Sequence, residues 1–285
     1  PFTVRYEGVR LYKSISHIEG GRAWIHRERV HSAGDGRFAI EPMDLLQPIL
    51  SAASEQVFLD SLHVRQSLNY RYRDLRIDDL ALFLDNYSIV DSGQKQYVAG
   101  RECAEFTIEK LEMAERRHIV RVDLEHGLIL SYVEESQQGD LLSSMEFEWV
   151  DFDPDQTGVT WYRPLNNEQP VDLISDVQSS FGFQPTLPRT LPAGYRLLES
   201  ASVQDLTGRA LLNVTYGDAL ERLFFVHGGP VSAGPLAAKW PSPDRVEVLD
   251  AVPWAAAQGN MAGQKVIALG KVPPVDLLIL LDSIR

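Results

Sequence analysis

The sequence has little of three things: cysteine, long apolar runs and basic charge. Cys103 is the single cysteine among 285 residues, so no disulfide can form within the chain, and a zinc site would need other ligands from distant segments. We expect Cys103 to be a small buried apolar residue. The most apolar stretch, Leu277–Leu281, is far shorter than the roughly 18 residues that a membrane-spanning helix requires.

Basic residues are outnumbered, 27 against 40 acidic ones, which gives a net charge of −13. Surfaces that bind nucleic acid need clustered Lys and Arg, so nucleic acid is an improbable partner. Anionic membrane surfaces are disfavoured for the same reason. From Leu187 onward 9 basic residues balance 9 acidic ones, so the whole net charge lies in residues 1–186. This asymmetry indicates two units with different surfaces.

The common catalytic and metal-binding motifs are absent as well. The seven histidines show no H-E-x-x-H or comparable spacing, and neither a G-x-S-x-G elbow nor a phosphate-binding G-x-x-x-x-G-K-[ST] loop occurs. Carboxylate pairs such as Asp78-Asp79 are expected by chance among so many acidic residues and fit a solvated surface. We therefore predict a protein that is not an enzyme and has no cofactor and no metal.

What the first 150 residues do contain is alternation of apolar and polar residues. Met145, Phe147 and Trp149, for example, alternate with glutamates, which is typical of a strand with one wet and one apolar face. Turn residues such as Glu125-His126-Gly127 separate several such segments. The pattern predicts a run of antiparallel hairpins.

Two segments depart from this alternation and are predicted to be helices. Met43–Leu62 has apolar residues near helical spacing, and Asp78–Leu84 reads as a shorter helix capped by Asp74 or Asp78. A long antiparallel sheet interrupted by helices predicts an α+β fold, in which a curved sheet forms a half-open barrel and the helices cover its concave face.

The remaining sequence predicts a connector and a second domain. Residues 154–186 contain recurrent prolines and read as a partly ordered connector. Residues 187–285 are predicted to form a small α+β domain of four or five strands and one helix, the helix following Pro273-Pro274. The expected division is thus 1–153, 154–186 and 187–285.

The large apolar residues of the first domain fit either an ordinary core or an apolar ligand pocket, and the sequence leaves both open. If there is a cavity, its lining is expected from residues that point inward on strands or lie on helix faces. These candidates are Phe58, Leu80, Leu84, Phe106, Val122, Met145, Phe147 and Trp149.

Several segments resemble the RseB/MucB family when taken in order. They are Asn86-Tyr87, Val98-Ala99-Gly100-Arg101-Glu102-Cys103, Arg121–Leu130, Leu191-Pro192-Ala193-Gly194-Tyr195, Tyr216-Gly217-Asp218 and Ile267–Pro274. The resemblance covers residues 86–285, while residues 1–85 agree only in general pattern. One departure is Gly217-Asp218-Ala219, where the family has Asp-Gly-Leu.

The resemblance implies a first domain like the lipoprotein carriers LolA and LolB, and a periplasmic negative regulator of an envelope-stress sigma-factor pathway. Such a protein binds the periplasmic part of a membrane anti-sigma factor, and a lipidic ligand is expected to release it. The region around Tyr195 and Tyr216 is a candidate partner surface. The resemblance also implies a location in the periplasm or cell envelope, and we expect that a signal peptide or lipid anchor has been removed from the chain, which starts at Pro1. The alternative function is a lipid or lipoprotein carrier with an apolar cavity.

Overall fold

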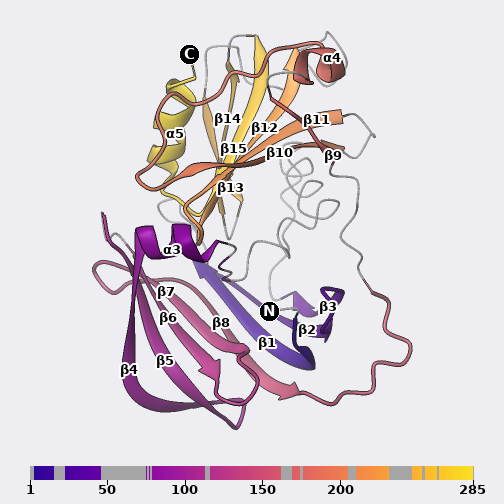
Figure 1. Ribbon diagram of the computed structural model, residues 1–285, viewed down its shortest axis with the longest axis vertical. Coiled ribbons are helices and arrows are strands. Elements are labelled where there is room, and N and C mark those ends of the chain that lie inside the picture. The colour runs from indigo at the N-terminus through magenta and orange to yellow at the C-terminus, as the bar shows by residue number, and fades with distance from the viewer. Residues whose placement is uncertain are drawn as a thin grey trace. The chain divides into compact units, whose positions relative to one another are not determined.

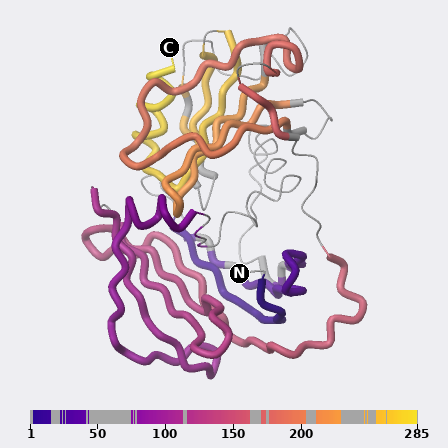
Figure 2. Tube along the Cα trace, in the orientation of Figure 1, coloured from indigo at the N-terminus to yellow at the C-terminus, as the bar shows by residue number. Residues whose placement is uncertain are grey.

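The computed structural model describes residues 3–15, 23–45, 75, 77, 79–112, 116–161, 169–173, 176–204, 210–230, 246–251, 254–261 and 263–284. These residues fall into two compact units, each built on its own antiparallel sheet (Figure 1, Figure 2). The described residues up to 161 belong to unit 1, and those from 169 onward belong to unit 2.

Unit 1 is an eight-stranded sheet with the order β3-β2-β1-β8-β7-β6-β5-β4. The strands at its two ends, β3 and β4, do not pair with each other, so the sheet is open rather than closed into a barrel (Figure 1). The predicted α+β class with an antiparallel, half-open sheet is confirmed. The strands are β1 (Arg5–Ile15), β2 (Ala23–Ala33), β3 (Phe38–Leu45), β4 (Tyr87–Val98), β5 (Arg101–Lys110), β6 (Arg116–Asp123), β7 (Ile129–Ser136) and β8 (Leu141–Asp151).

The described helix of unit 1 is α3 (Leu80–Asn86), which leads directly into β4. Its N-cap is Asp79, whose side chain accepts a hydrogen bond from the Leu82 N–H at 2.9 Å. This corrects the predicted caps: Asp79 has an extended backbone and a carboxylate three residues before that N–H, as an N-cap requires. The predicted helix Met43–Leu62 lies almost wholly outside the described residues, and its first three residues belong to β3.

The alternation in the sequence separates a buried face from a charged outer face. The buried face carries apolar and aromatic side chains from every strand, including Tyr6, Tyr12, Val30, Ile40, Val120, Tyr132, Met145 and Phe147. The outer face carries cross-strand ion pairs: Arg27 with Glu148, Arg117 with Glu135, and Arg121 with Glu105. Opposite charges facing one another on neighbouring strands stabilise the pairing modestly and keep this face wet.

Unit 2 is a seven-stranded sheet with the order β13-β14-β15-β12-β11-β10-β9. Its elements are β9 (Gln169–Pro170), α4 (Val177–Phe181), β10 (Arg196–Gln204), β11 (Ala210–Gly217), β12 (Arg222–Pro230), β13 (Glu247–Ala251), β14 (Trp254–Met261), β15 (Gln264–Gly270) and α5 (Pro274–Asp282). Of these, the described part of residues 187–285 contains six strands, where four or five were predicted, and the one predicted helix, α5. Strand β14 was missed because alanine, glycine and asparagine have low strand propensity, which burial here overrides.

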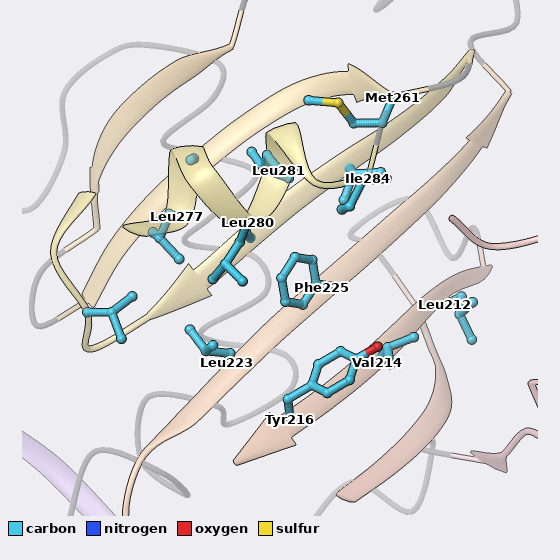
Figure 3. Close-up of a cluster of buried hydrophobic side chains, with 14 of the residues drawn as sticks. Leu212, Val214, Tyr216, Leu223, Phe225, Met261, Leu277, Leu280, Leu281 and Ile284 are labelled. Carbon is cyan, nitrogen blue, oxygen red and sulfur yellow. The ribbon is translucent and has the colours of Figure 1, made fainter. Parts of the chain in front are cut away.

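The core of unit 2 forms where α5 packs on one face of this sheet (Figure 3). Leu277, Leu280 and Leu281 of the helix are buried over Leu223 and Phe225 of β12. The opposite face is buried too, since Phe224, Val226, Ile267 and Leu269 are almost fully inaccessible. A sheet buried on both faces explains why these strands read as nearly continuous apolar runs.

The segment predicted as a connector contributes to each unit separately. The Gln156 side-chain amide donates to the carbonyl oxygen of Ser32 at 2.9 Å in unit 1, and the Arg37 guanidinium carbon lies 5.3 Å from the Trp161 ring centre. In unit 2, β9 pairs with β10 and Val177 enters the core. Among the described helices none is long and apolar enough to cross a membrane.

Candidate functional site

The buried face of unit 1 brings together four of the residues predicted to line an apolar site. Cross-strand register places Phe106 opposite Val120, Val120 opposite Tyr132, and Tyr132 opposite Met145. Directly opposed residues share a face, so these side chains form one row across β5–β8. Val122 and Phe147 are on the same face, two residues farther along β6 and β8. Met145 and Phe147 are buried, whereas Phe106 and Val122 are partly exposed.

Trp149 lies on the other face, which corrects the expected alternation. Strand β1 pairs Arg10 with Phe147 but its neighbour Val9 with Trp149, so Glu148 is an extra residue in β8. Adjacent residues of β1 point to opposite faces, and their partners therefore do so as well. The bulge turns Trp149 outward, where it is 46% exposed.

The other candidates do not join this row. Leu80 and Leu84 lie one turn apart on the exposed side of α3, while its buried residues are Leu82 and Phe83. Phe58 lies outside the described residues. The role of the predicted residues in ligand binding stays a prediction.

The buried face also holds an ion pair that the sequence analysis did not single out. The Arg10 Nε atom donates to Glu28 Oε1 at 2.7 Å, and the two side chains are 1% and 2% exposed. The Arg10 guanidinium also lies 5.1 Å from the Tyr12 ring centre and 5.9 Å from that of Phe147. A signal was present in the sequence: Arg10 and Glu28 occupy the inward phase of otherwise apolar alternations.

A second polar cluster on this face surrounds the carboxylate of Glu134. It accepts from Arg116 Nη1 at 2.7 Å, from the Tyr132 hydroxyl at 2.6 Å and from the Ser143 hydroxyl at 2.8 Å. Burial and the neighbouring Glu134 charge raise the pKa of Tyr132 well above its usual value, so this phenol stays protonated. Bonded networks of this kind fix side chains in one arrangement.

Arg101, Asp123 and His126, from two segments that carry the family resemblance, form a cluster with Phe152 at the hairpin ends of unit 1. We name these four residues the clamp. Arg101 bonds Asp123, and the Asp123 carboxylate also accepts the His126 N–H at 2.6 Å. The His126 ring stacks on Phe152 with ring centres 3.6 Å apart. Cys103 is fully buried beside the clamp, as predicted.

Burial of Asp123 by itself would raise the pKa of its carboxyl, but the hydrogen bonds from Arg101 and His126 outweigh burial and lower that pKa. The carboxylate is therefore charged at neutral pH and joins the β4–β5 turn to the β6–β7 turn. Arg101, Asp123 and His126 thus have a structural role in this chain, because their hydrogen bonds hold the two hairpin ends together.

In unit 2, the two residues predicted for partner binding are largely buried. Tyr216 packs edge-on against Phe225 with ring centres 5.6 Å apart, and burial raises its pKa to about 12. The Tyr195 hydroxyl donates to Glu221 at 3.0 Å. Both side chains support the domain core, and a direct contact with a partner stays a prediction.

The described residues contain no group of three or more His, Cys, Asp or Glu side chains able to hold a metal ion.

Together the two units define a class of protein: an open antiparallel sheet joined in one chain to a smaller α+β unit. Solved structures of the same class cover nearly the whole chain. The crystal structure of MucB matches with a TM-score of 0.57 and 16% identity over 99% of this chain and 92% of that one. The Pseudomonas aeruginosa MucA/MucB complex matches with 0.56 and 14% identity, over 97% and 91%.

A further structure, MucB in complex with MucA(peri), matches with a TM-score of 0.54 and 15% identity over 98% of this chain and 92% of that chain. The chain therefore has an RseB/MucB-like fold, as the sequence resemblance predicted. No protein-family model matches the chain, and no curated protein matches it.

Proposed function

We propose that this protein is a periplasmic negative regulator of an envelope-stress sigma-factor pathway and that it binds the periplasmic segment of a membrane anti-sigma factor. The observation that carries the proposal is the likeness to MucB across both units of the chain, together with the MucA complexes among the similar structures.

Binding without covalent chemistry agrees with the chemistry of unit 1. Its buried charged groups Arg10, Glu28, Glu134 and Asp123 all form ion pairs inside the protein. Groups engaged in this way stabilise the sheet and are poorly placed to attack a substrate. We accordingly propose that the protein is not an enzyme and acts through a shift between partner-bound and free states.

The releasing signal is proposed to be a lipidic ligand on the apolar row of unit 1. The partly exposed Phe106 and Val122 offer apolar contacts beside the buried Met145 and Phe147. A ligand that binds more tightly to the free state would displace the partner in proportion to that difference in affinity.

The alternative function, a lipid or lipoprotein carrier, rests on the same open sheet. Unit 2 favours the regulator, because its extensive core and seven-stranded sheet supply a second surface that a carrier does not need. The two functions differ in what they retain from the cell envelope.

The test is an affinity capture from a detergent-solubilised envelope fraction, with the tagged full chain as bait. A regulator is expected to retain a single-span membrane protein whose cytoplasmic part binds a sigma factor. Retention of lipids or lipoproteins without such a protein would overturn the regulator and support the carrier.

A further inference from the structure

We propose that the outer edge of β4, from Tyr87 to Asp91, is a docking site for an extended peptide segment with alternating aliphatic residues and with lysine or arginine beside them. The proposal goes beyond the regulator function and does not depend on it, because any polypeptide of this chemistry would satisfy the site.

Strand β4 ends the sheet of unit 1, and no described strand pairs with its outer edge. Its residues are exposed from Ile89 through Lys95. The outer backbone groups of an edge strand are a template on which another strand adds by hydrogen bonding.

The length of this edge is set by a break in β4. Pairing with β5 is regular from Tyr87 to Asp91 and then shifts before Lys95. In the break, the Asp91 carboxylate accepts the Gly93 N–H at 2.8 Å, which engages that amide locally. The break interrupts the regular pairing, which resumes only at Lys95, so the regular stretch of edge before it is about five residues long.

Aliphatic side chains lie on both sides of this short edge. Ile89 and Val90 are 46% and 58% exposed and, as neighbours in a strand, point to opposite faces. Leu84 of α3 and Leu111 are also more than half exposed. The Leu111 N–H donates to the Asn86 carbonyl at 2.8 Å, which holds this leucine beside the start of β4. An added strand would therefore meet apolar surface with its successive side chains.

The charges around the edge select the partner. Asp85, Asp91, Glu109 and Glu112 are exposed, and none of them forms an ion pair within the described part of the chain. Four carboxylates around an apolar strip favour a cationic segment and disfavour anionic lipid. Pairing of this edge with a second copy of itself would bring the same carboxylates together, so a cationic peptide is the better occupant.

The probe is a fluorescent ten-residue peptide of alternating valine and lysine, titrated into the full chain by fluorescence anisotropy. We expect Val90→Lys to weaken binding at least tenfold, since it places a cation in the strip. The matched control is Val275→Lys, because Val275 is exposed to the same extent, 57%, on α5 of unit 2. It should leave the dissociation constant unchanged. Glu109→Gln with Glu112→Gln should weaken binding several-fold.

Two results separate strand addition from simple charge attraction. The same peptide with every backbone amide N-methylated keeps its charge but loses the N–H groups on both of its edges, and it should bind at least tenfold more weakly. In the unaltered protein, peptide should slow amide hydrogen exchange of residues 87–91. Equal binding of the N-methylated peptide, or no slowing at these amides, would overturn the proposal whether or not the Val90→Lys variant folds.

Discussion

The Arg101 guanidinium donates to both oxygens of the Asp123 carboxylate, Nε to Oδ2 at 2.8 Å and Nη2 to Oδ1 at 3.3 Å. The Asp123 side chain is 1% exposed, and the same carboxylate accepts backbone N–H groups in the β6–β7 turn. One buried carboxylate therefore ties two hairpin ends together at one end of the sheet.

Replacing this carboxylate should destabilise unit 1. Asp123→Ala removes the partner of Arg101 and leaves turn N–H groups without an acceptor, and we expect a loss of roughly 2–4 kcal/mol in the free energy of unfolding. Urea denaturation measures this loss. The control is Arg117→Ala, which breaks an exposed pair with Glu135 and should cost below about 1 kcal/mol. Equal losses in both variants would contradict the structural role of the clamp.

Because of the bulge in β8, we expect different losses of stability when two aromatic residues two positions apart are replaced. Phe147 is 1% exposed and packs so closely on β1 that a Cβ atom at Gly8 would lie 2.6 Å from its ring. Phe147→Ala should cost roughly 3–5 kcal/mol, whereas Trp149→Ala on the outer face should cost about 1 kcal/mol. Thermal or urea unfolding distinguishes them, and a larger loss for Trp149→Ala would show that the alternation continues through β8 without a bulge.

The turn between β11 and β12 contains a strained alanine. Ala219 has φ +83°, a left-handed conformation that costs about 1–2 kcal/mol for a residue with a Cβ atom. Ala219→Gly should therefore raise stability by roughly 0.5–1 kcal/mol after the entropy cost of glycine is included. As a control, Ala256→Gly in the buried strand β14 should lower stability. A decrease in melting temperature for Ala219→Gly would refute the strain.

His227 makes the stability of unit 2 depend on pH. Its ring is fully buried beside Phe183, and burial lowers its pKa from 6.5 to about 4. The folded state keeps the ring neutral while the unfolded chain takes up a proton below pH 6.5. Stability is therefore fully present above pH 6.5 and is lost as the pH falls toward 4. Between pH 6.5 and 5 we expect a loss of about 2 kcal/mol from this residue.

Hydrogen exchange of the β12 amides, measured across this pH range, reports the effect in unit 2. The His227→Leu variant removes the titrating group and should abolish most of the pH dependence. The same dependence in the variant would mean that another group causes it.

Periodicity was sufficient to predict strands β5 to β8 and the buried positions of Met145 and Phe147, because alternation follows directly from the geometry of a strand. It could not predict that Trp149 points outward, because the bulge at Glu148 depends on how β8 pairs with β1. The cap of α3 was misplaced because several aspartates precede the helix, and their order in the sequence does not show which carboxylate accepts the Leu82 N–H.

The polar groups of the buried face show a second limit of prediction from the sequence. Arg10 and Glu28 are far apart in the sequence and only the β1–β2 register places them opposite each other. Strand β14 illustrates a third, since Ala255 and Ala257 are poor strand formers that become buried under α5 only in the complete unit. In both cases the sequence alone lacks the information about which distant strands and helices come together.

The most direct test of the regulator account is to delete the gene in its host and measure the transcripts that depend on each sigma factor. The account predicts that the transcripts of one envelope-stress sigma factor rise in the absence of stress and return to normal when the full chain is restored. Unchanged sigma-factor transcripts in the deletion strain, with the envelope lipids or lipoproteins misplaced, would contradict it.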